Sequence, residues 1–261
     1  MELFNGDCLE IMKTLPDKSI DLFLCDLPYG CLTQQKGVNN NKNSKSPCNA
    51  GCSWDIKIDL EEFWKQVKRL CKNDKTPVIM FCNARFGFDL YNSNPAWFRY
   101  DLIWSKGRGV GFLGANKQPL RSHELIYVFS KKGANYYRKD IEGDFKRVGG
   151  GSDKKAKLGI YGLIKGDENR NNEGRRCVKS VIEVSNTIAK GQHPTAKPID
   201  LYKFLIERYS KEGDTILDPT FGSGHSGLAS IDLNRKYIGI EKDEKFFTKF
   251  SSAREEGRER D

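Results

Sequence analysis

The sequence contains no run of 18 apolar residues, so it offers no candidate for a membrane-spanning helix. It also lacks, at its start, the basic and then apolar pattern of a secretory signal peptide. Its hydrophobic content of 38%, with 11% aromatic residues, argues against disorder over 261 residues. We therefore expect a cytoplasmic protein that forms one sizeable domain, or one domain with an inserted lobe.

The eight cysteines lack the spacing of a metal site. Cys48 and Cys52 form the only close pair, and no second pair of cysteine or histidine ligands matches it. The other cysteines are scattered among strand-like and helix-like segments, which favours reduced thiols over disulfides. The sequence therefore predicts no bound metal.

One short stretch combines the groups that could bind a planar amine. The apolar run from Ile20 to Cys25 predicts a buried strand, which Pro28 and Gly30 end. The segment Asp26 to Tyr29 therefore lies at the carboxyl end of a strand, where open α/β sheets bind ligands. Its carboxylate and backbone carbonyls can accept amino hydrogens, and its aromatic ring can stack on the ring that carries the amine.

A second strand, Thr215 to Asp218, leads into a turn, Pro219 to Gly224, and then into a predicted helix. Glycines allow a ligand to approach the backbone, and a helix N-terminus favours a negative group. The next strand, Tyr237 to Glu241, ends in a carboxylate at the position that binds ribose hydroxyls in dinucleotide folds. The turn lacks the Gly-x-Gly-x-x-Gly dinucleotide fingerprint.

The remaining elements follow from apolar spacing and from turn residues. Between two of the predicted strands, residues 105–119 are glycine-rich and basic, but no helix follows them, so they are not a nucleotide P-loop. The sequence predicts helices at 8–15, 59–70, 199–209, 226–233 and 245–250, strands at 77–82, 97–104 and 124–130, the last two as an antiparallel edge pair, and a frayed tail at 254–261.

These motifs resemble those of the amino-methyltransferases that modify exocyclic nitrogens of nucleobases. Asp26-Leu27-Pro28-Tyr29 is similar to the family's Asp/Asn/Ser-Pro-Pro-Tyr motif, with leucine at the second position. Thr215 to Gly224 resembles the family's S-adenosylmethionine loop, and His193 to Pro198 resembles the segment before that loop. The order of the three motifs, which cover nearly the whole chain, is that of the circularly permuted beta group.

The resemblance implies an α/β fold with a doubly wound, mostly parallel seven-stranded sheet of the Rossmann-like methyltransferase type. Residues 1–132 would form the catalytic half, with a mobile loop at 31–53, and residues 191–261 the cofactor-binding half. Residues 133–190 would form an inserted basic lobe that recognises the target. The activity implied is site-specific methylation of DNA, of the restriction-modification kind.

The same resemblance assigns roles to individual residues. Asp26 and the carbonyl of Leu27 or Pro28 would accept the two amino hydrogens of a flipped base, while Tyr29 stacks on it. Asp7 would meet the adenine amino group of the cofactor, S-adenosylmethionine, although an aspartate there is also a good helix N-cap. The other expected cofactor contacts are Thr195 and Lys197 at the methionine end, Glu241 at the ribose, and Asp218, Thr220, Phe221, Gly222, Ser223 and Gly224 in the loop. Phe112 and His123 are candidates for the wall of the base pocket, or else they pack structurally.

Most of the net charge of +9 comes from the predicted recognition region. Residues 131–190 contain 15 Lys or Arg against 8 Asp or Glu, which is the charge pattern of phosphate contact or of a solvated surface. Together with the motifs, it predicts double-stranded DNA as the partner. The candidate contacts are Lys146, Arg147, Lys154, Lys155, Arg170, Arg175 and Arg176.

Adenine N6 is the expected target, because an aspartate opens the motif more often in that class, and beta-group relatives are often homodimers. Cytosine N4 is the first alternative, since its amine has the same geometry. A ribosomal RNA N6-adenine methyltransferase and an inactive DNA-binding protein also stay open. Pro47-Cys48 is the dipeptide of carbon-5 cytosine methyltransferases, but no strand precedes it, so it receives no role.

Overall fold

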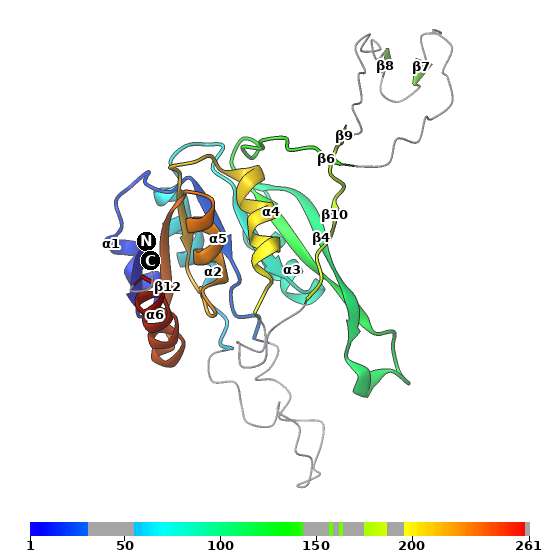
Figure 1. Ribbon diagram of the computed structural model, residues 1–261. Coiled ribbons are helices and arrows are strands. Elements are labelled where there is room, and N and C mark those ends of the chain that lie inside the picture. Colours follow the sequence, from blue (N-terminus) through cyan, green and yellow to red (C-terminus); the bar gives the residue numbers. More distant parts are fainter. Residues whose placement is uncertain (31–54, 143–156, 159–161, 164–174, 187–195, 259–261) are drawn as a thin grey trace. The chain divides into compact units, whose positions relative to one another are not determined.

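A computed structural model describes residues 1–30, 55–142, 157–158, 162–163, 175–186 and 196–258 (Figure 1). Contacts divide the chain into two compact units. The first unit comprises Met1–Tyr137 and Ser180–Asp261, and the second comprises Arg138–Lys179. The second unit lies within the range 133–190 predicted for target recognition, and that role stays a prediction.

The first unit is built on an eight-stranded sheet with the order β1-β12-β11-β2-β3-β5-β4-β10. Every strand except β5 runs in the same direction. The predicted fold class is confirmed, but the sheet has one strand more than expected, because β10 is only three residues long and has no clear alternation. The strands are β1 (Glu2–Asn5), β2 (Leu22–Cys25), β3 (Val78–Cys82), β4 (Phe98–Val110), β5 (Arg121–Phe129), β10 (Val181–Glu183), β11 (Thr215–Asp218) and β12 (Lys236–Glu241).

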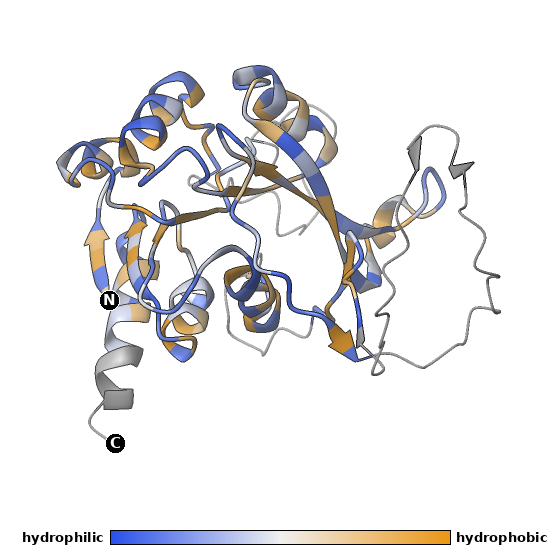
Figure 2. Ribbon diagram, turned by 90° about the horizontal axis from the view of Figure 1, so that it is seen from above, coloured by the Kyte–Doolittle hydropathy of each residue, from blue (hydrophilic) through white to orange (hydrophobic). Residues whose placement is uncertain are grey.

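Helices cover both faces of this sheet, so the unit has three layers (Figure 2). On one face lie α1 (Cys8–Thr14), α2 (Leu60–Leu70) and α3 (Ala84–Ser93). On the other lie α4 (Ile199–Tyr209), α5 (His225–Asp232) and α6 (Glu244–Arg258). The central strands β2 and β3 are buried along their whole length, which explains their continuous apolar runs.

Local sequence signals account for most of these helices. Asp59 caps α2 by accepting hydrogen bonds from the backbone N–H groups of Glu61 and Glu62. The sequence analysis did not predict α3, although Asn83 caps it by accepting from the N–H of Phe86. The predicted tail from Arg254 is wrong over residues 254–258, because α6 continues to Arg258.

The five cysteines among the described residues are free thiols, and four of them are buried. Burial raises the pKa of Cys8, Cys71 and Cys82 to about 12, so these thiols stay protonated and act as small apolar side chains. Cys48 and Cys52 lie outside the described residues. Across the described ranges, no helix combines the length and the apolar character that crossing a membrane requires.

The second unit contains two short antiparallel pairs. Strand β6 (Ile141–Glu142) pairs with β9 (Arg175–Arg176), and β7 (Lys157–Leu158) pairs with β8 (Gly162–Leu163). Two of the predicted DNA contacts, Arg175 and Arg176, therefore form β9. Lys146, Arg147, Lys154, Lys155 and Arg170 lie outside the described residues.

Candidate active site

The two main motifs meet at the carboxyl edge of the sheet. Strands β2 and β11 are neighbours, although nearly 200 residues of chain separate them. Asp26 follows β2, and the Thr220 hydroxyl in the loop after β11 donates to the backbone carbonyl of Asp26 at 3.0 Å. The strand order also reverses here, since the chain leaves β2 for β3 on one side and returns to β11 on the other. Such a switch point is where open α/β sheets form ligand crevices.

Both carboxylate oxygens of Asp26 have partners. The Tyr29 hydroxyl donates to Oδ1 at 3.0 Å, and the Lys197 ammonium group forms an ion pair with Oδ2. The Lys197 side chain is only 4% exposed and lies over the Phe81 ring, 4.6 Å from its centroid. Because each carboxylate oxygen has two acceptor positions, Asp26 can still accept an amino hydrogen.

A second carboxylate balances the charge of Lys197. Glu124 Oε2 lies 3.7 Å from Lys197 Nζ, and Lys106 forms an ion pair with Oε1 of the same residue. Burial would raise the pKa of Glu124, but the charges of Lys197 and Lys106 outweigh it, so the pKa lies below its usual value. The four charges therefore alternate in sign from Asp26 through Lys197 and Glu124 to Lys106. We call this set the charge chain.

Sequence reasoning missed Lys106 and Glu124 as site residues. Lys106 lies within β4 and Glu124 within β5, and in the sheet β3 stands between β5 and β2, the strand that precedes Asp26. The available signal was a lysine and a glutamate at the borders of apolar strand segments. Charged side chains at such positions need partners when they are buried.

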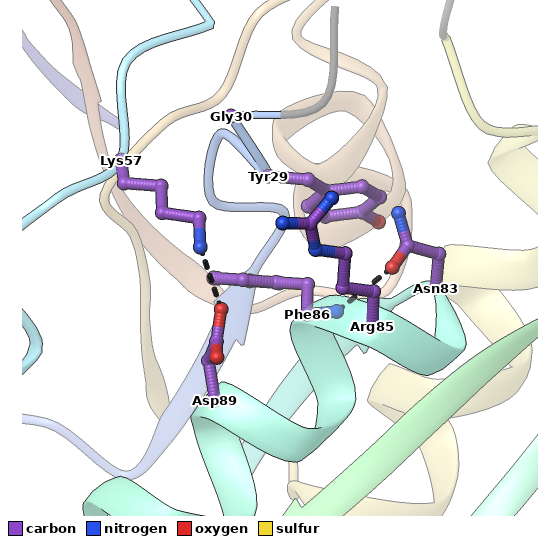
Figure 3. Close-up of a pocket in the computed structure, with 7 residues that line it drawn as sticks. All are labelled: Tyr29, Gly30, Lys57, Asn83, Arg85, Phe86 and Asp89. Atoms are coloured by element: carbon purple, nitrogen blue, oxygen red, sulfur yellow. Dashed lines mark hydrogen bonds and ion pairs between the residues drawn. The ribbon is translucent and has the colours of Figure 1, made fainter. Parts of the chain in front are cut away.

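Tyr29 is fixed as a neutral donor. Its ring stacks on Phe86, with centroids 5.1 Å apart and an interplanar angle of 26°. Burial, together with the negative charge of Asp26, raises the pKa of Tyr29 well above its usual value, so the hydroxyl keeps its proton. Figure 3 shows the pocket beside it, which is lined by Tyr29, Gly30, Lys57, Asn83, Arg85, Phe86 and Asp89.

Gly30 closes the motif in a conformation that favours glycine. Its φ is +65°, and a Cβ there would lie 2.6 Å from Cγ of Lys57. Its backbone N–H donates to Asp55, which is buried, while Lys57 pairs with Asp89 at 2.7 Å across the pocket (Figure 3). Because residue 30 is a glycine, it lines the pocket without covering it with a side chain.

Leu27 explains the departure from the Pro-Pro-Tyr pattern. Its side chain is 1% exposed and packs in the core cluster under α1, α2 and α3. The proposed chemistry requires only a backbone carbonyl at this position, so a core leucine can replace the proline. The acceptor roles of the Leu27 and Pro28 carbonyls stay predictions.

Two carboxylates, those of Asp218 and Glu241, stabilise the loop after β11 by accepting hydrogen bonds. Asp218 accepts from the Thr220 N–H at 3.0 Å and from the Ser226 hydroxyl at 2.6 Å, and its burial raises its pKa to about 7. Glu241 accepts from the Gly222 N–H at 2.9 Å, and burial also raises its pKa. The structure thus brings the predicted cofactor residues of the loop next to Glu241, while Phe221 is buried in the core rather than open.

Asp7 performs the helix-capping role that the sequence suggested. It accepts from the Leu9 N–H at 3.0 Å and pairs with Lys242 at 3.0 Å. Partial burial would raise the pKa of Asp7, but these two partners outweigh it and the pKa is lowered. Since Asn5 of β1 is paired with Glu241 of β12, Asp7 and Glu241 follow neighbouring strands. The contact of Asp7 with the cofactor stays a prediction.

Other predicted residues have mixed outcomes. The structure pairs Lys197 with Asp26 and Glu124, and its expected contact with the methionine end of the cofactor stays a prediction. Thr195 lies outside the described residues. Phe112 and His123 are exposed on the β4–β5 hairpin, so the alternative that they pack structurally is wrong.

Comparison with known proteins decides the family. A family model described as DNA methylase, of the N6/N4 type, matches residues 20–252. The chain belongs to the N6/N4 DNA methylase family. S-adenosylmethionine is the methyl donor of this family, as the sequence motifs predicted.

Two curated proteins to which this chain is similar are named Type II methyltransferases. M.HinfI from Haemophilus influenzae is 29% identical over 94% of this chain, which spans 65% of that protein's length. M.XycI from Xanthomonas campestris pv. cyanopsidis is 30% identical over 94% of this chain and 85% of its own.

Solved structures agree with the fold of this DNA methylase. M1.HpyAVI in complex with S-adenosylmethionine matches with a TM-score of 0.60, 18% identity, and coverage of 97% of this chain and 98% of the other. The cytosine-N4-specific PvuII DNA methyltransferase matches with a TM-score of 0.60, 16% identity, and coverage of 94% and 83%. At these identities the likeness establishes the fold alone.

Proposed function

We propose that this DNA methylase transfers a methyl group from S-adenosylmethionine to the exocyclic N6 of adenine in a specific sequence of double-stranded DNA. The observation that carries the proposal is the junction of Asp26 with the loop after β11. A carboxylate held by Tyr29 and Lys197 is joined there to the loop through the hydrogen bond between Thr220 and Asp26. This junction supports a site in which an amine acceptor lies next to the methyl donor.

The residues present fit the cofactor. Glu241 ends β12 and supports the Gly222 backbone, which suits a carboxylate that receives ribose hydroxyls. Asp7 follows the neighbouring strand and is the acceptor for the adenine amino group. When bound, S-adenosylmethionine supplies an electrophilic methyl group. Residues 218–224 would hold it beside the crevice that contains Asp26.

The chain's own groups prepare the nitrogen for attack. An amine inside a duplex is out of reach, so the base is flipped out, at a cost of roughly a few kcal/mol. Asp26 and the carbonyl of Leu27 or Pro28 accept its two amino hydrogens, which draws the nitrogen toward tetrahedral geometry. Tyr29, braced on one side by Phe86, stacks on the base. As the nitrogen gains the methyl group, the bond from that group to the donor sulfur would break, and the nitrogen would lose one of its two hydrogens as a proton, which Asp26 is placed to accept. Alignment of the nitrogen with the methyl group accounts for most of the catalysis.

Lys197 serves this arrangement by holding Asp26 in place. Its ammonium group is engaged by Asp26 and Glu124, so its position supports a role in orienting the acceptor. Its predicted contact with the cofactor carboxylate would place a third negative group on the same ammonium. Orientation of Asp26 by Lys197 depends on Glu124, whereas contact of Lys197 with the cofactor carboxylate does not. Substitution of Glu124 can therefore separate the two roles.

Cytosine N4 is the second candidate target, because its amine presents two hydrogens in the same plane as adenine N6. The test is transfer of labelled methyl from S-adenosylmethionine to unmethylated duplex DNA, followed by digestion and mass analysis of the nucleosides. N6-methyladenine is the expected product. N4-methylcytosine would keep the mechanism and change the base, while label on RNA alone would contradict the proposed substrate.

A further inference from the structure

Strands β4 and β5 continue beyond the sheet as a two-stranded arm, which we define as residues 107–123. Pairing of β4 with its outer neighbour β10 ends at Ser105, and pairing of β5 with β3 ends at Leu125. Beyond Lys106, whose carbonyl still accepts from the Asn186 N–H, the strand pairing of the arm among the described residues is between β4 and β5 alone, and nearly every residue of the arm is exposed. Figure 1 shows β4 and β5 running together past the other strands to a helical turn at the tip.

The arm leaves the sheet at the edge where Asp26 lies. Strand β4 runs parallel to β2, and the last residue of β2, Cys25, is level in the sheet with Asp101. The continuation of β4 from Asp101 to Val110 therefore projects beyond the end of β2. Lys106 and Glu124, which flank the arm, belong to the charge chain that holds Asp26. The arm thus lies on the same side of the sheet edge as Asp26, and the residues at its base belong to the charge chain.

The side chains of the arm combine positive charge with an apolar tip. Its charged residues are Arg108, Lys117 and Arg121, and it contains no aspartate or glutamate. At the tip, the turn Phe112–Gly114 presents Phe112 with 78% and Leu113 with 92% of its surface exposed. Neither residue belongs to the two core clusters. Two adjacent large apolar side chains on an exposed turn do not stabilise the fold.

We propose that this arm enters the target duplex and inserts Phe112 and Leu113 into the base stack beside the nucleotide that is delivered to Asp26. The inference rests on the proposed function. A major groove about 12 Å wide admits a two-stranded ribbon, and apolar wedges between base steps unstack them. Arg108, Lys117 and Arg121 contact the flanking phosphates. The wedge occupies the stack that the flipped base leaves, so it favours the flipped state.

Charge decides between DNA and a second copy of the chain as the occupant. The arm carries three positive charges without an acid, on a chain of net charge +9. Two such arms, or an arm and another copy of a basic chain, repel each other, whereas phosphates attract the arm. The position of the arm beside Asp26 favours the same partner over a lipid surface.

The test compares the double variant Phe112→Ala/Leu113→Ala with wild type on two duplexes. One is matched at the target base, and the other has an abasic site opposite it, so that the base is already unpaired. The variant is expected to lose about tenfold or more in kcat/KM on the matched duplex and much less on the abasic one. Ile231→Ala, at an exposed position of α5, is the matched control and should equal wild type on both duplexes.

Several results would contradict the wedge or the function on which it rests. Equal rates for the variant and wild type on the matched duplex, or equal losses on both duplexes, would overturn the wedge. A variant that changes a wild-type dimer into a monomer in light scattering would show a subunit contact instead and would overturn it too. Failure of wild type to methylate any DNA would contradict the proposed function, which separates that failure from failure of the wedge alone.

The cationic residues give an independent readout. Replacing Arg108 with Ala should weaken binding to all duplex sequences and should reduce the slope of log Kd against log salt by about 1. Arg108→Lys, which keeps the charge, should restore the slope. An unchanged slope in Arg108→Ala would contradict contact of the arm with phosphate.

Discussion

At the scale of single residues, the central feature is the ammonium group of Lys197, which lies between the carboxylates of Asp26 and Glu124. Lys106 lies on the other side of Glu124, so each charge has an opposite neighbour. Removing one member of a buried ion pair leaves its partner uncompensated, which costs more than the pair contributes. The geometry of Asp26 therefore depends on residues that do not touch it.

Glu124→Gln tests that dependence. The variant should lose about 2 kcal/mol in its free energy of unfolding, less than for a fully buried pair because Glu124 is partly exposed. Its kcat should fall about tenfold with little change in KM. The reason is that Lys197, the partner of Asp26, is no longer held in place by the charge of Glu124. Urea unfolding and steady-state kinetics measure both. Glu10→Gln, which breaks the exposed pair with Lys13, is the matched control and should leave the stability nearly unchanged.

The pH dependence of this effect has a defined sign. The pKa of Glu124 in the folded protein is lowered, so its ionised form contributes stability above the ordinary value of 4.5. That contribution is lost as pH falls through the lowered pKa. The stability difference between wild type and Glu124→Gln should therefore shrink below about pH 4. A difference that is constant from pH 7 to pH 3 would contradict the charge chain.

Asp218 should give the opposite pH dependence. Burial raises its pKa in the folded state from 3.8 to about 7, so between these values the folded protein keeps a proton that the unfolded chain releases. Wild type should therefore lose stability as pH rises through this range, relative to Asp218→Asn. Thermal unfolding of both proteins at pH 5 and pH 8 measures the difference. An identical pH profile for the two proteins would contradict a buried, raised-pKa carboxyl.

At the scale of elements, the loop between β11 and α5 fixes where the cofactor can lie. Gly224 has φ of +76°, and a Cβ on it would lie 2.1 Å from the Phe250 ring of α6. The chain can therefore make this turn only without a side chain. Because the helix N-terminus follows directly, the same glycine sets the position of its free N–H groups.

Gly224→Ala should consequently lose both stability and cofactor binding. The backbone strain of a left-handed residue costs about 1–2 kcal/mol, and the clash with Phe250 adds about 1–3 kcal/mol. Gly213→Ala is the matched control, since its φ is +80° but no atom lies within 4 Å of the added Cβ. It should show the strain alone, with unchanged cofactor affinity in calorimetry. Equal losses in the two variants would show that the close approach has no effect.

The sequence predicted these elements well wherever local patterns are strong. The spacing of apolar residues alone predicts helix α2 and the apolar strands β2 and β3. The structure confirms all three elements. Helix α3 was not predicted because Gly87 and polar residues obscure the helical spacing of its apolar residues. The glycine has a packing reason, since a Cβ at this position would lie 2.8 Å from the Tyr127 hydroxyl. Lys106 and Glu124 escaped because they pair with each other across neighbouring strands and with Lys197, which lies far along the chain, and no local pattern records such pairing.

At the scale of the whole molecule, the division into two units separates the chemistry from the predicted recognition of sequence. Both hydrophobic core clusters consist entirely of residues from the first unit. The junction of Asp26 with the loop after β11 lies in the same unit. Among the described residues, the core of the first unit therefore contains no side chain from the second.

Replacing residues 138–179 with a flexible Gly/Ser linker should consequently leave a folded protein. We expect cooperative thermal unfolding and S-adenosylmethionine affinity close to wild type, because the core and the cofactor loop are kept. Methylation of the specific site should fall toward the level on unrelated sequences, since Arg175 and Arg176 are removed with the lobe. Loss of cofactor binding, or full sequence preference without the lobe, would contradict this division.

Asp26→Ala tests the central claim most directly, when methyl transfer to duplex DNA and S-adenosylmethionine affinity are measured on the same preparation. The account predicts an affinity close to wild type and a transfer rate reduced by about 100-fold or more, because the amine loses its acceptor. Asp17→Ala, which removes an exposed carboxylate away from the site, should leave both unchanged. Full transfer by Asp26→Ala would contradict the account.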